Sequence, residues 1–167
     1  LSDWSSDVCS SDLPKTKLTG PQELFLGSML FYFRKLGWEP HMTYGLAANI
    51  YAETTFRPNL TGDGGHAYGL CQWHGDRQAK FEEVFGIKMM NATVDQQFEF
   101  IHWEMFHPKS AERGVGLRLR NAKDAKEAAA IISKYYERPR KDEGATRGAF
   151  AEALFNRYEN PSAKPEG

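Results

Sequence analysis

The sequence predicts a predominantly helical α+β protein that contains one small β-hairpin or ordered loop. Apolar side chains recur every three or four residues over several long segments, which is the spacing of helices that bury one face. The stretch 60–73 differs, because it holds four glycines in fourteen residues. Such a composition is typical of turns between short strands.

Composition excludes several classes of protein. The chain has 167 residues, 41% hydrophobic and 13% aromatic, which is enough for one core and too apolar for a disordered chain. Its two cysteines do not make a disulfide framework, and its net charge of -1 gives no electrostatic reason to expect nucleic acid. The longest strongly apolar run, 24–33, is shorter than the ~20 residues of a membrane span.

The first thirteen residues, LSDWSSDVCSSDL, have no hydrophobic period that could pack. Residues 3–13 resemble a translated sequencing adapter, and the alternative is a natural Ser-rich disordered leader. In either case, residues 1–13 are not expected to contribute to the fold. Without its three aspartates the remaining body holds 21 basic and 19 acidic residues, about +2. Cys71 is then the lone thiol, which favours a packed hydrophobe over a nucleophile.

Two helices are expected before the glycine-rich stretch. The first runs from Pro21 to Gly37, and its face is formed by Leu24, Leu26, Met29, Leu30, Phe33 and Leu36. Read as a signal peptide, the same region lacks a small-residue cleavage site. The second helix starts at Pro40, a good first-turn residue, and reaches about Thr55 before Pro58 excludes helical geometry.

Further helices follow the glycine-rich stretch. Thr93 and Gln96 form a capping-box signature, and the helix behind it stops at Pro108. Asn121 is expected to cap a segment that ends before Pro139, and 143–158 gives a last helix. Residues 160–167 form a polar tail or the start of a linker. Residues 109–147 hold 11 bases and 6 acids, a bias that suits either an anionic polymer or an ordinary solvated face.

A carboxylate lies on the apolar stripe of the second helix. Leu46, Ile50 and Glu53 are spaced i, i+4 and i+7, so Glu53 is expected to face the core while Asn49 faces water. Burial of a carboxyl group raises its pKa, as a general acid near neutral pH requires. The alternative is that Glu53, one turn from the helix end, reaches solvent or caps a loop.

The glycine-rich stretch carries groups that suit a sugar. Asp63 supplies a carboxylate, Gln72 an amide, and Tyr68 and Trp73 aromatic faces that can stack on pyranose rings. The alternatives are that Asp63 bonds its own turn backbone and that the aromatic rings fill the core. The sequence leaves both possibilities open.

These pieces occur together in an order that resembles the phage tail-type lysozymes. The matching pieces are Glu53-Thr54 with Phe56 and Pro58, then Gly62-Asp63-Gly64-Gly65, then residues 68–73, and finally Tyr135-Tyr136-Glu137-Arg138-Pro139. Thr54 stands where the family commonly has serine. The resemblance implies a lysozyme-like catalytic domain over 20–159, with an active-site cleft beside the hairpin, that cuts the β-1,4 bond between N-acetylmuramic acid and N-acetylglucosamine.

The resemblance also implies roles for individual residues. Glu53 would be the general acid, and Asp63 the second carboxylate, which activates water or stabilises an oxocarbenium-like transition state. Gln72 would bond an N-acetyl group or position water, and His66 would line the cleft. Ring contacts would come from Tyr68, Trp73 and Tyr136.

Two other functions are compatible with the same residues. A lytic transglycosylase would form anhydro-muramyl ends with one glutamate, and a non-catalytic module would only bind glycan. The expected partner is bacterial peptidoglycan, together with other phage tail proteins, for a monomeric domain in the virion or released to the wall, with no nucleic acid or membrane. No cofactor or metal is expected, because His102 and His107 are five apart, and His66 and His74 are expected to flank the loop without acidic company.

Overall fold

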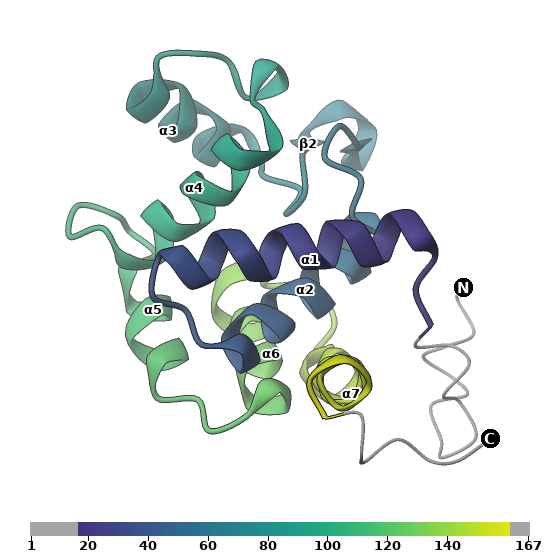
Figure 1. The fold of residues 1–167 in the computed structure, drawn as a ribbon. Coiled ribbons are helices and arrows are strands. Elements are labelled where there is room, and N and C mark those ends of the chain that lie inside the picture. Colours follow the sequence, from purple (N-terminus) through teal and green to yellow (C-terminus); the bar gives the residue numbers. More distant parts are fainter. Residues whose placement is uncertain (1–16, 161–167) are drawn as a thin grey trace. The chain divides into compact units, whose positions relative to one another are not determined.

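The computed structural model describes residues 17–160, so the expectations for 1–13 and for 161–167 lie outside the described residues. The described chain is predominantly helical with a small antiparallel sheet of two strands, as predicted (Figure 1). The helices are α1 (Gly20–Lys35), α2 (Pro40–Thr54), α3 (Gly75–Phe85), α4 (Val94–Phe106), α5 (Arg113–Arg120), α6 (Ala125–Ile132) and α7 (Gly144–Glu159). The strands are β1 (Thr61–Gly62) and β2 (Ala67–Tyr68). No described helix combines the length and the apolar character that crossing a membrane requires.

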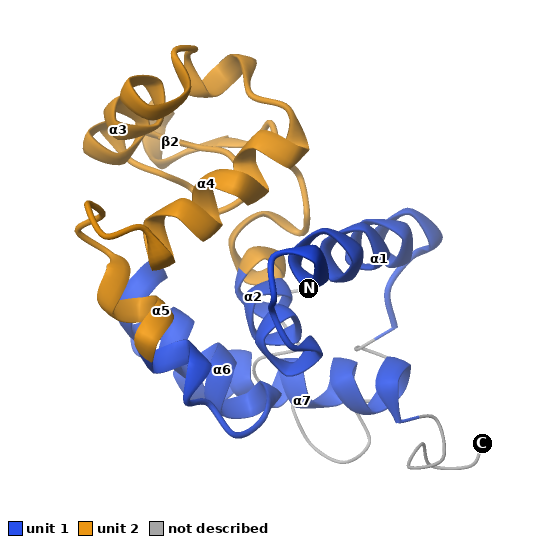
Figure 2. Ribbon diagram, turned by 60° about the vertical axis from the view of Figure 1, so that its left-hand side comes forward, with its two compact units in different colours: residues 1–49, 118–167 blue, residues 50–117 orange. Residues whose placement is uncertain are grey.

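The chain divides into two compact units (Figure 2). Of the described residues, unit 1 contains 17–49 and 118–160, and unit 2 contains 50–117. Helices α2 and α5 each begin in one unit and end in the other. Each unit has its own buried apolar side chains and its own buried polar contacts.

Helix α1 of unit 1 begins at a capping box that the apolar pattern does not indicate. The Thr19 hydroxyl accepts a hydrogen bond from the Gln22 backbone, and the Gln22 side chain accepts one from the Thr19 backbone. This reciprocal pair satisfies two backbone donors at the helix start. The helix ends one residue before Leu36, and Gly37 follows with a φ of 88°. The helix therefore ends two residues before the predicted Gly37, which takes the left-handed conformation common just after a helix end.

The prediction that Asn49 faces water is wrong. Asn49 is fully buried, and its Nδ2 donates to the carbonyl oxygens of Gly45 (2.9 Å) and Ala129 (3.0 Å). Its Oδ1 accepts from Arg147 of α7 (2.9 Å), whose guanidinium also bonds Glu143. A polar side chain is tolerated there because each of its groups has a buried partner. Asn49 thus connects α2, α6 and α7.

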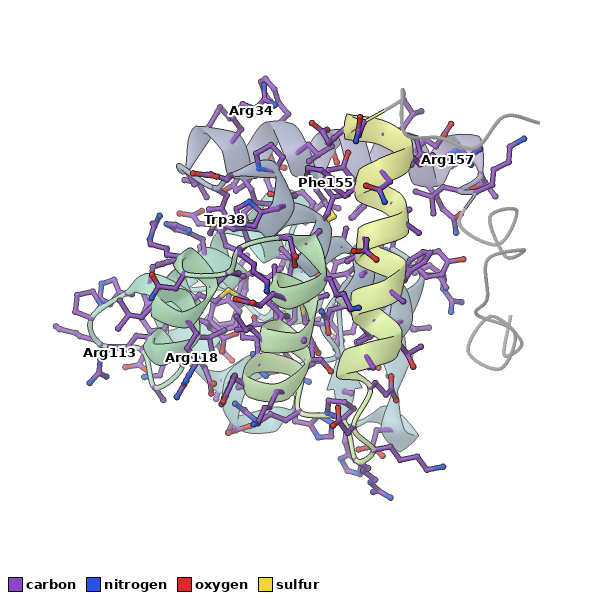
Figure 3. All side chains as sticks on the ribbon, turned by 90° about the horizontal axis from the view of Figure 1, so that it is seen from below. Arg34, Trp38, Arg113, Arg118, Phe155 and Arg157 are labelled. Carbon is purple, nitrogen blue, oxygen red and sulfur yellow. The ribbon has the colours of Figure 1, made fainter. Side chains whose placement is uncertain are left out.

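Close packing between α2 and α6 depends on Gly45. A Cβ at this position would lie 2.7 Å from the Ala128 Cβ and 2.7 Å from the Ala129 nitrogen. Helix α7 packs on the same group of helices, and its Phe155, labelled in Figure 3, meets Tyr44 edge-on with ring centroids 5.4 Å apart. The helices of unit 1 are therefore joined by small residues as well as by aromatic rings.

The start of α6 differs from the prediction. Its N-cap is Asp124, whose side chain accepts from the Glu127 backbone at 2.8 Å, and Asn121 lies in the preceding turn. Both residues are good caps, so local preference alone did not decide between them. The expected single helix also changes after Ile132 into a short π-helix, Ser133–Glu137, which ends at Arg138 with a φ of 52°.

Unit 2 is built around aromatic side chains from α3, α4 and the segment that follows the hairpin. Phe81 meets Phe100 edge-on with centroids 5.3 Å apart, and Phe100 lies 5.5 Å from Trp73. Helix α4 begins at the predicted Thr93 and Gln96 capping box and ends before Pro108. Both of these predictions are confirmed. Helices α3 and α5 were not separately indicated by the sequence pattern.

Candidate functional site

Glu53 lies in the last turn of α2 and its side chain is half-buried. The two residues that follow Thr54 have positive φ angles, 50° at Thr55 and 68° at Phe56. This conformation is unfavourable for a β-branched or bulky residue, and such strain occurs most often at functional sites. The helix therefore ends at a strained turn directly beside the candidate acid.

Local contacts hold this turn in place. The Thr54 carbonyl oxygen accepts hydrogen bonds from the Arg57 backbone (3.1 Å) and from Arg57 Nε (3.0 Å). The Thr55 amide donates to the Tyr51 carbonyl at 2.8 Å. Phe56 is buried, and its ring meets that of Tyr51 edge-on at 5.5 Å between centroids. These contacts offset the cost of the backbone angles.

The predicted hairpin is present. Strands β1 and β2 pair antiparallel, with Thr61 opposite Tyr68 and Gly62 opposite Ala67, and a 3-10 turn at Asp63–Gly65 connects them. Asp63 opens this turn with a φ of 50°. The carboxylate is exposed, and its Oδ2 lies 3.5 Å from His74 Nε2, with both side chains 56% exposed. The expectation that His74 has no acidic company is therefore wrong, because the hairpin brings Asp63, eleven residues earlier in the chain, to its side.

Gln72 also has a positive φ, 50°, and its side-chain amide forms hydrogen bonds with the backbone of the glycine-rich segment. Its Nε2 donates to the carbonyl oxygens of Leu60 (2.9 Å) and Gly69 (3.0 Å). A glutamine amide has two N–H donors, so Oε1 is the part of the side chain left for a ligand. Oε1 lies against Gly62, where a Cβ would approach it to 2.2 Å. A side chain at position 62 would therefore displace the Gln72 amide from this position.

Leu70 is the point at which three elements of unit 2 meet. Its amide donates to Gln97 Oε1 of α4 at 3.0 Å, and its carbonyl oxygen lies 3.1 Å from the Thr54 hydroxyl. Gln97 is fully buried, and its Nε2 donates to the Pro58 carbonyl at 2.9 Å. One buried amide thus fixes both the segment after Glu53 and the segment after the hairpin.

Sequence reasoning did not single out Gln97. It lies beside Phe98 within the α4 pattern, and a polar residue at the edge of an apolar stripe gives no sign of burial. Sequence reasoning also assigned no role to the Thr54 hydroxyl, beyond the observation that the family commonly has serine at that position. In the structure this hydroxyl contacts Ile50 and Leu70.

Trp73 and Tyr136 are both fully buried. The indole Nε1 of Trp73 donates to Glu104 Oε1 at 3.0 Å, and Arg77 holds the same carboxylate at 2.8 and 2.9 Å. Tyr136 lies in the π-helix of unit 1. In the described conformation neither ring face is open to a sugar, so both rings act in packing. Contact with substrate by these two residues stays a prediction that their burial does not support.

Tyr68 and His66 are more accessible. Tyr68 is half-buried, and its hydroxyl lies 3.2 Å from Asn59 Oδ1 and 3.4 Å from the Met90 carbonyl. His66 is exposed, and its carbonyl oxygen accepts from Gln78 Nε2 at 3.3 Å. Both therefore remain available as ligand contacts. Across residues 17–160, no group of three or more His, Cys, Asp and Glu side chains could hold a metal ion.

Taken together, unit 2 presents a half-buried glutamate at a strained helix end and an exposed carboxylate in a glycine-rich hairpin that is fixed by buried amides. Carboxylates are among the side chains that serve in acid–base chemistry, so Glu53 and Asp63 remain the candidate residues of this unit. The sequence profile of the phage tail lysozymes matches residues 28–158, and the chain belongs to this family. Membership implies peptidoglycan-degrading activity.

One related protein is morphogenesis protein 1 of Bacillus phage B103. The two chains are 27% identical over 140 residues, which cover 76% of this chain and 37% of the relative. The chain therefore corresponds to little more than a third of that protein. No solved structure shows a significant match to the chain.

Proposed function

We propose that this domain hydrolyses the β-1,4 bond between N-acetylmuramic acid and N-acetylglucosamine in peptidoglycan. Glu53 donates a proton to the glycosidic oxygen as the bond to the anomeric carbon breaks. A water molecule adds to that carbon and returns a proton to solvent or to a carboxylate. Asp63 is the second carboxylate, which activates this water or stabilises the positive charge that develops on the sugar.

The observation that carries the proposal is the double attachment of Leu70. The hydroxyl of Thr54, the neighbour of Glu53, donates to the Leu70 carbonyl oxygen, and the Leu70 amide donates to Gln97, so the helix end and the glycine-rich segment are held in one arrangement. General acid catalysis needs its groups fixed in this way, because a proton is transferred only over hydrogen-bond distance. Membership in the phage tail lysozyme family supports the same assignment.

The accessible side chains complete the proposed site. Gln72 accepts a hydrogen bond from the substrate through Oε1, since its N–H groups bond Leu60 and Gly69. Tyr68 contacts a sugar ring, and His66 lies at the exposed turn between the strands. We further propose that the domain acts as part of a phage tail protein and that its partners are peptidoglycan strands and other tail proteins.

The test is digestion of purified peptidoglycan by the wild type and by Glu53→Gln, with the products analysed by mass spectrometry. We expect reducing muramyl ends from the wild type and a rate about 10²- to 10⁴-fold lower from the variant, because general acid catalysis contributes about that much. Glu99→Gln, which changes an exposed glutamate on α4 of the same unit, is the matched control.

Each other outcome has a definite meaning. Anhydro-muramyl ends would identify a lytic transglycosylase. If neither form yields products while peptidoglycan binding is retained, the domain is a non-catalytic module. Asp63→Asn then decides the role of the second carboxylate: unchanged activity would remove Asp63 from the mechanism.

A further inference from the structure

A pocket of about 320 Å³ lies wholly within unit 2, between the hairpin, α3 and the short 3-10 helix Met89–Asn91. Its volume is at the lower end of the range of about 300–1,000 Å³ that is usual for small-ligand sites. The lining residues that carry its chemistry are Thr61, Tyr68, Gln78, Glu82, Lys88 and Met90. Neither Glu53 nor Asp63 lines it.

The pocket offers hydrogen-bond acceptors whose positions are fixed. Gln78 Nε2 donates to the carbonyl oxygens of Trp73 (2.7 Å) and His66 (3.3 Å), which leaves Oε1 to accept from a ligand. The Tyr68 hydroxyl donates within the protein, so its oxygen can also accept. Two acceptors of this kind suit the N–H groups of a ligand with amide bonds.

The pocket also carries both signs of charge. Lys88 Nζ lies 3.3 Å from Glu82 Oε2, and these side chains are 67% and 49% exposed. An exposed pair of this kind contributes only about 0–1 kcal/mol, so Lys88 can exchange its partner for a ligand carboxylate at little cost. Met90 is largely exposed beside the buried Met89, and methionine adapts its shape to small apolar groups.

This combination distinguishes between the two parts of peptidoglycan. The glycan backbone carries no charge along its sugar rings, whereas the stem peptides carry carboxylates, amide N–H groups and small apolar side chains. Building on the proposed function, we propose that the pocket binds the stem peptide of the peptidoglycan strand. Lys88 binds a peptide carboxylate, Tyr68 and Gln78 accept from its amides, and Met90 contacts its side chains.

The direct test is titration of the folded chain with an N-acetylated stem tetrapeptide, followed by NMR. We expect shifts at the Gln78 side-chain amide and the Met90 methyl group. Lys88→Met should weaken peptide binding about tenfold, the loss of about 1.4 kcal/mol. Lys80→Met is the matched control, since Lys80 also pairs with an exposed glutamate of unit 2, Glu83, but does not line the pocket. Equal losses in the two variants, or no shift at either probe, would overturn the proposal.

A second variant blocks the pocket without removing a charge. A Cβ at Gly75 meets no atom within 4 Å and its φ is not positive, so Gly75→Leu places its side chain in open space at the pocket wall. Gly114→Leu is the control, because Gly114 is equally open and lies outside the lining. We expect peptide binding to be lost only in Gly75→Leu, and retention there would count against the pocket.

Cleavage of two different substrates distinguishes failure of the peptide-binding pocket from failure of the proposed hydrolase activity. The wild type is given intact peptidoglycan and glycan strands from which the peptides have been removed by an amidase. Cleavage of both at equal rates without tetrapeptide binding would reject the pocket and leave the hydrolase intact. Tetrapeptide binding without cleavage of either substrate would reject the hydrolase and leave the pocket.

Discussion

Both units bury polar side chains, but these side chains form hydrogen bonds with regular helices in unit 1 and with irregular segments in unit 2. In unit 1, Asn49 and Arg147 connect regular helices, and their partners include helical carbonyl oxygens. In unit 2, Gln97 and Thr54 bond the irregular segments on either side of the hairpin. The buried hydrogen bonds of unit 1 thus connect helices to one another, whereas those of unit 2 fix the irregular segments beside the hairpin.

Backbone strain follows the same division. Of the non-glycine residues with positive φ, Thr55, Phe56, Asp63 and Gln72 lie in unit 2, and Arg138 is the described example in unit 1. Each such conformation costs of the order of 1–3 kcal/mol and persists only where surrounding contacts enforce it. The candidate catalytic carboxylates therefore lie where the fold holds unfavourable backbone in place.

The largest loss of stability in unit 2 is expected from Arg77→Met. Arg77 is partly buried and pairs with the buried Glu104, and removal of the guanidinium leaves this carboxylate buried without its cation, while it still accepts from the Trp73 indole. Breaking a buried pair costs about 3–5 kcal/mol. Chemical denaturation measures the change in the free energy of unfolding.

Lys80→Met provides the comparison for this loss. It removes an exposed ion pair with Glu83, which contributes at most about 1 kcal/mol. If Arg77→Met costs no more than Lys80→Met, the Glu104 network does not support the segment that contains Trp73.

Gln97→Met tests the two hydrogen bonds that the buried Gln97 amide makes with Leu70 and Pro58. The substitution keeps the volume but leaves the Leu70 amide and the Pro58 carbonyl without their partner, at about 1–3 kcal/mol for each group. Amide hydrogen exchange should show Leu70 losing protection. Gln97→Glu retains the acceptor for Leu70 and should preserve more of that protection than the methionine does. Equal exchange in all three proteins would mean that Gln97 does not fix the loop.

Gly45→Ala makes the matching change in the scaffold of unit 1. Its Cβ would overlap Ala128 and Ala129, and overpacking of this kind costs about 1–3 kcal/mol. Gly27→Ala is the control, because that helical position is open and alanine should stabilise the chain by about 0.5–1 kcal/mol. Thermal denaturation should therefore show shifts of opposite sign in the two variants.

The smallest expected effect on stability concerns Tyr44 and is observed only at alkaline pH. Burial first, and the hydrogen bond and charge of Glu159 next, raise the pKa of Tyr44 above its usual value. The folded state therefore favours the neutral phenol, and the stability that this provides is complete below about pH 10 and is lost as the pH rises further.

Tyr44→Phe should lessen this alkaline loss. Above pH 10 the free energy of unfolding of the wild type should fall faster than that of the variant, by about 1.4 kcal/mol per pH unit. Part of the loss should remain in the variant, because burial and Glu23 also raise the pKa of Tyr158. Parallel curves from pH 9 to pH 11 would contradict the assignment.

The predictions that succeeded rest on short-range signals. The Thr93 and Gln96 capping box marks the start of α4, and the glycines near Asp63 mark the hairpin. Where two signals of equal strength compete, as with Asn121 and Asp124, the local sequence did not identify the true cap. Helical spacing also predicted that Asn49 faces water. The spacing of residues within α2 does not show that α6 and α7 cover the face of α2 that carries Asn49.

The sequence by itself determined the helical class, the hairpin, the family and the candidate carboxylates, because each depends on residues close together in the chain or on a motif read in order. Tertiary structure alone decided that Trp73 and Tyr136 are buried, that Asp63 lies beside His74, and that Gln97 holds two loops. These facts depend on contacts between segments distant in sequence. The environment of a side chain is fixed only when such segments pack together.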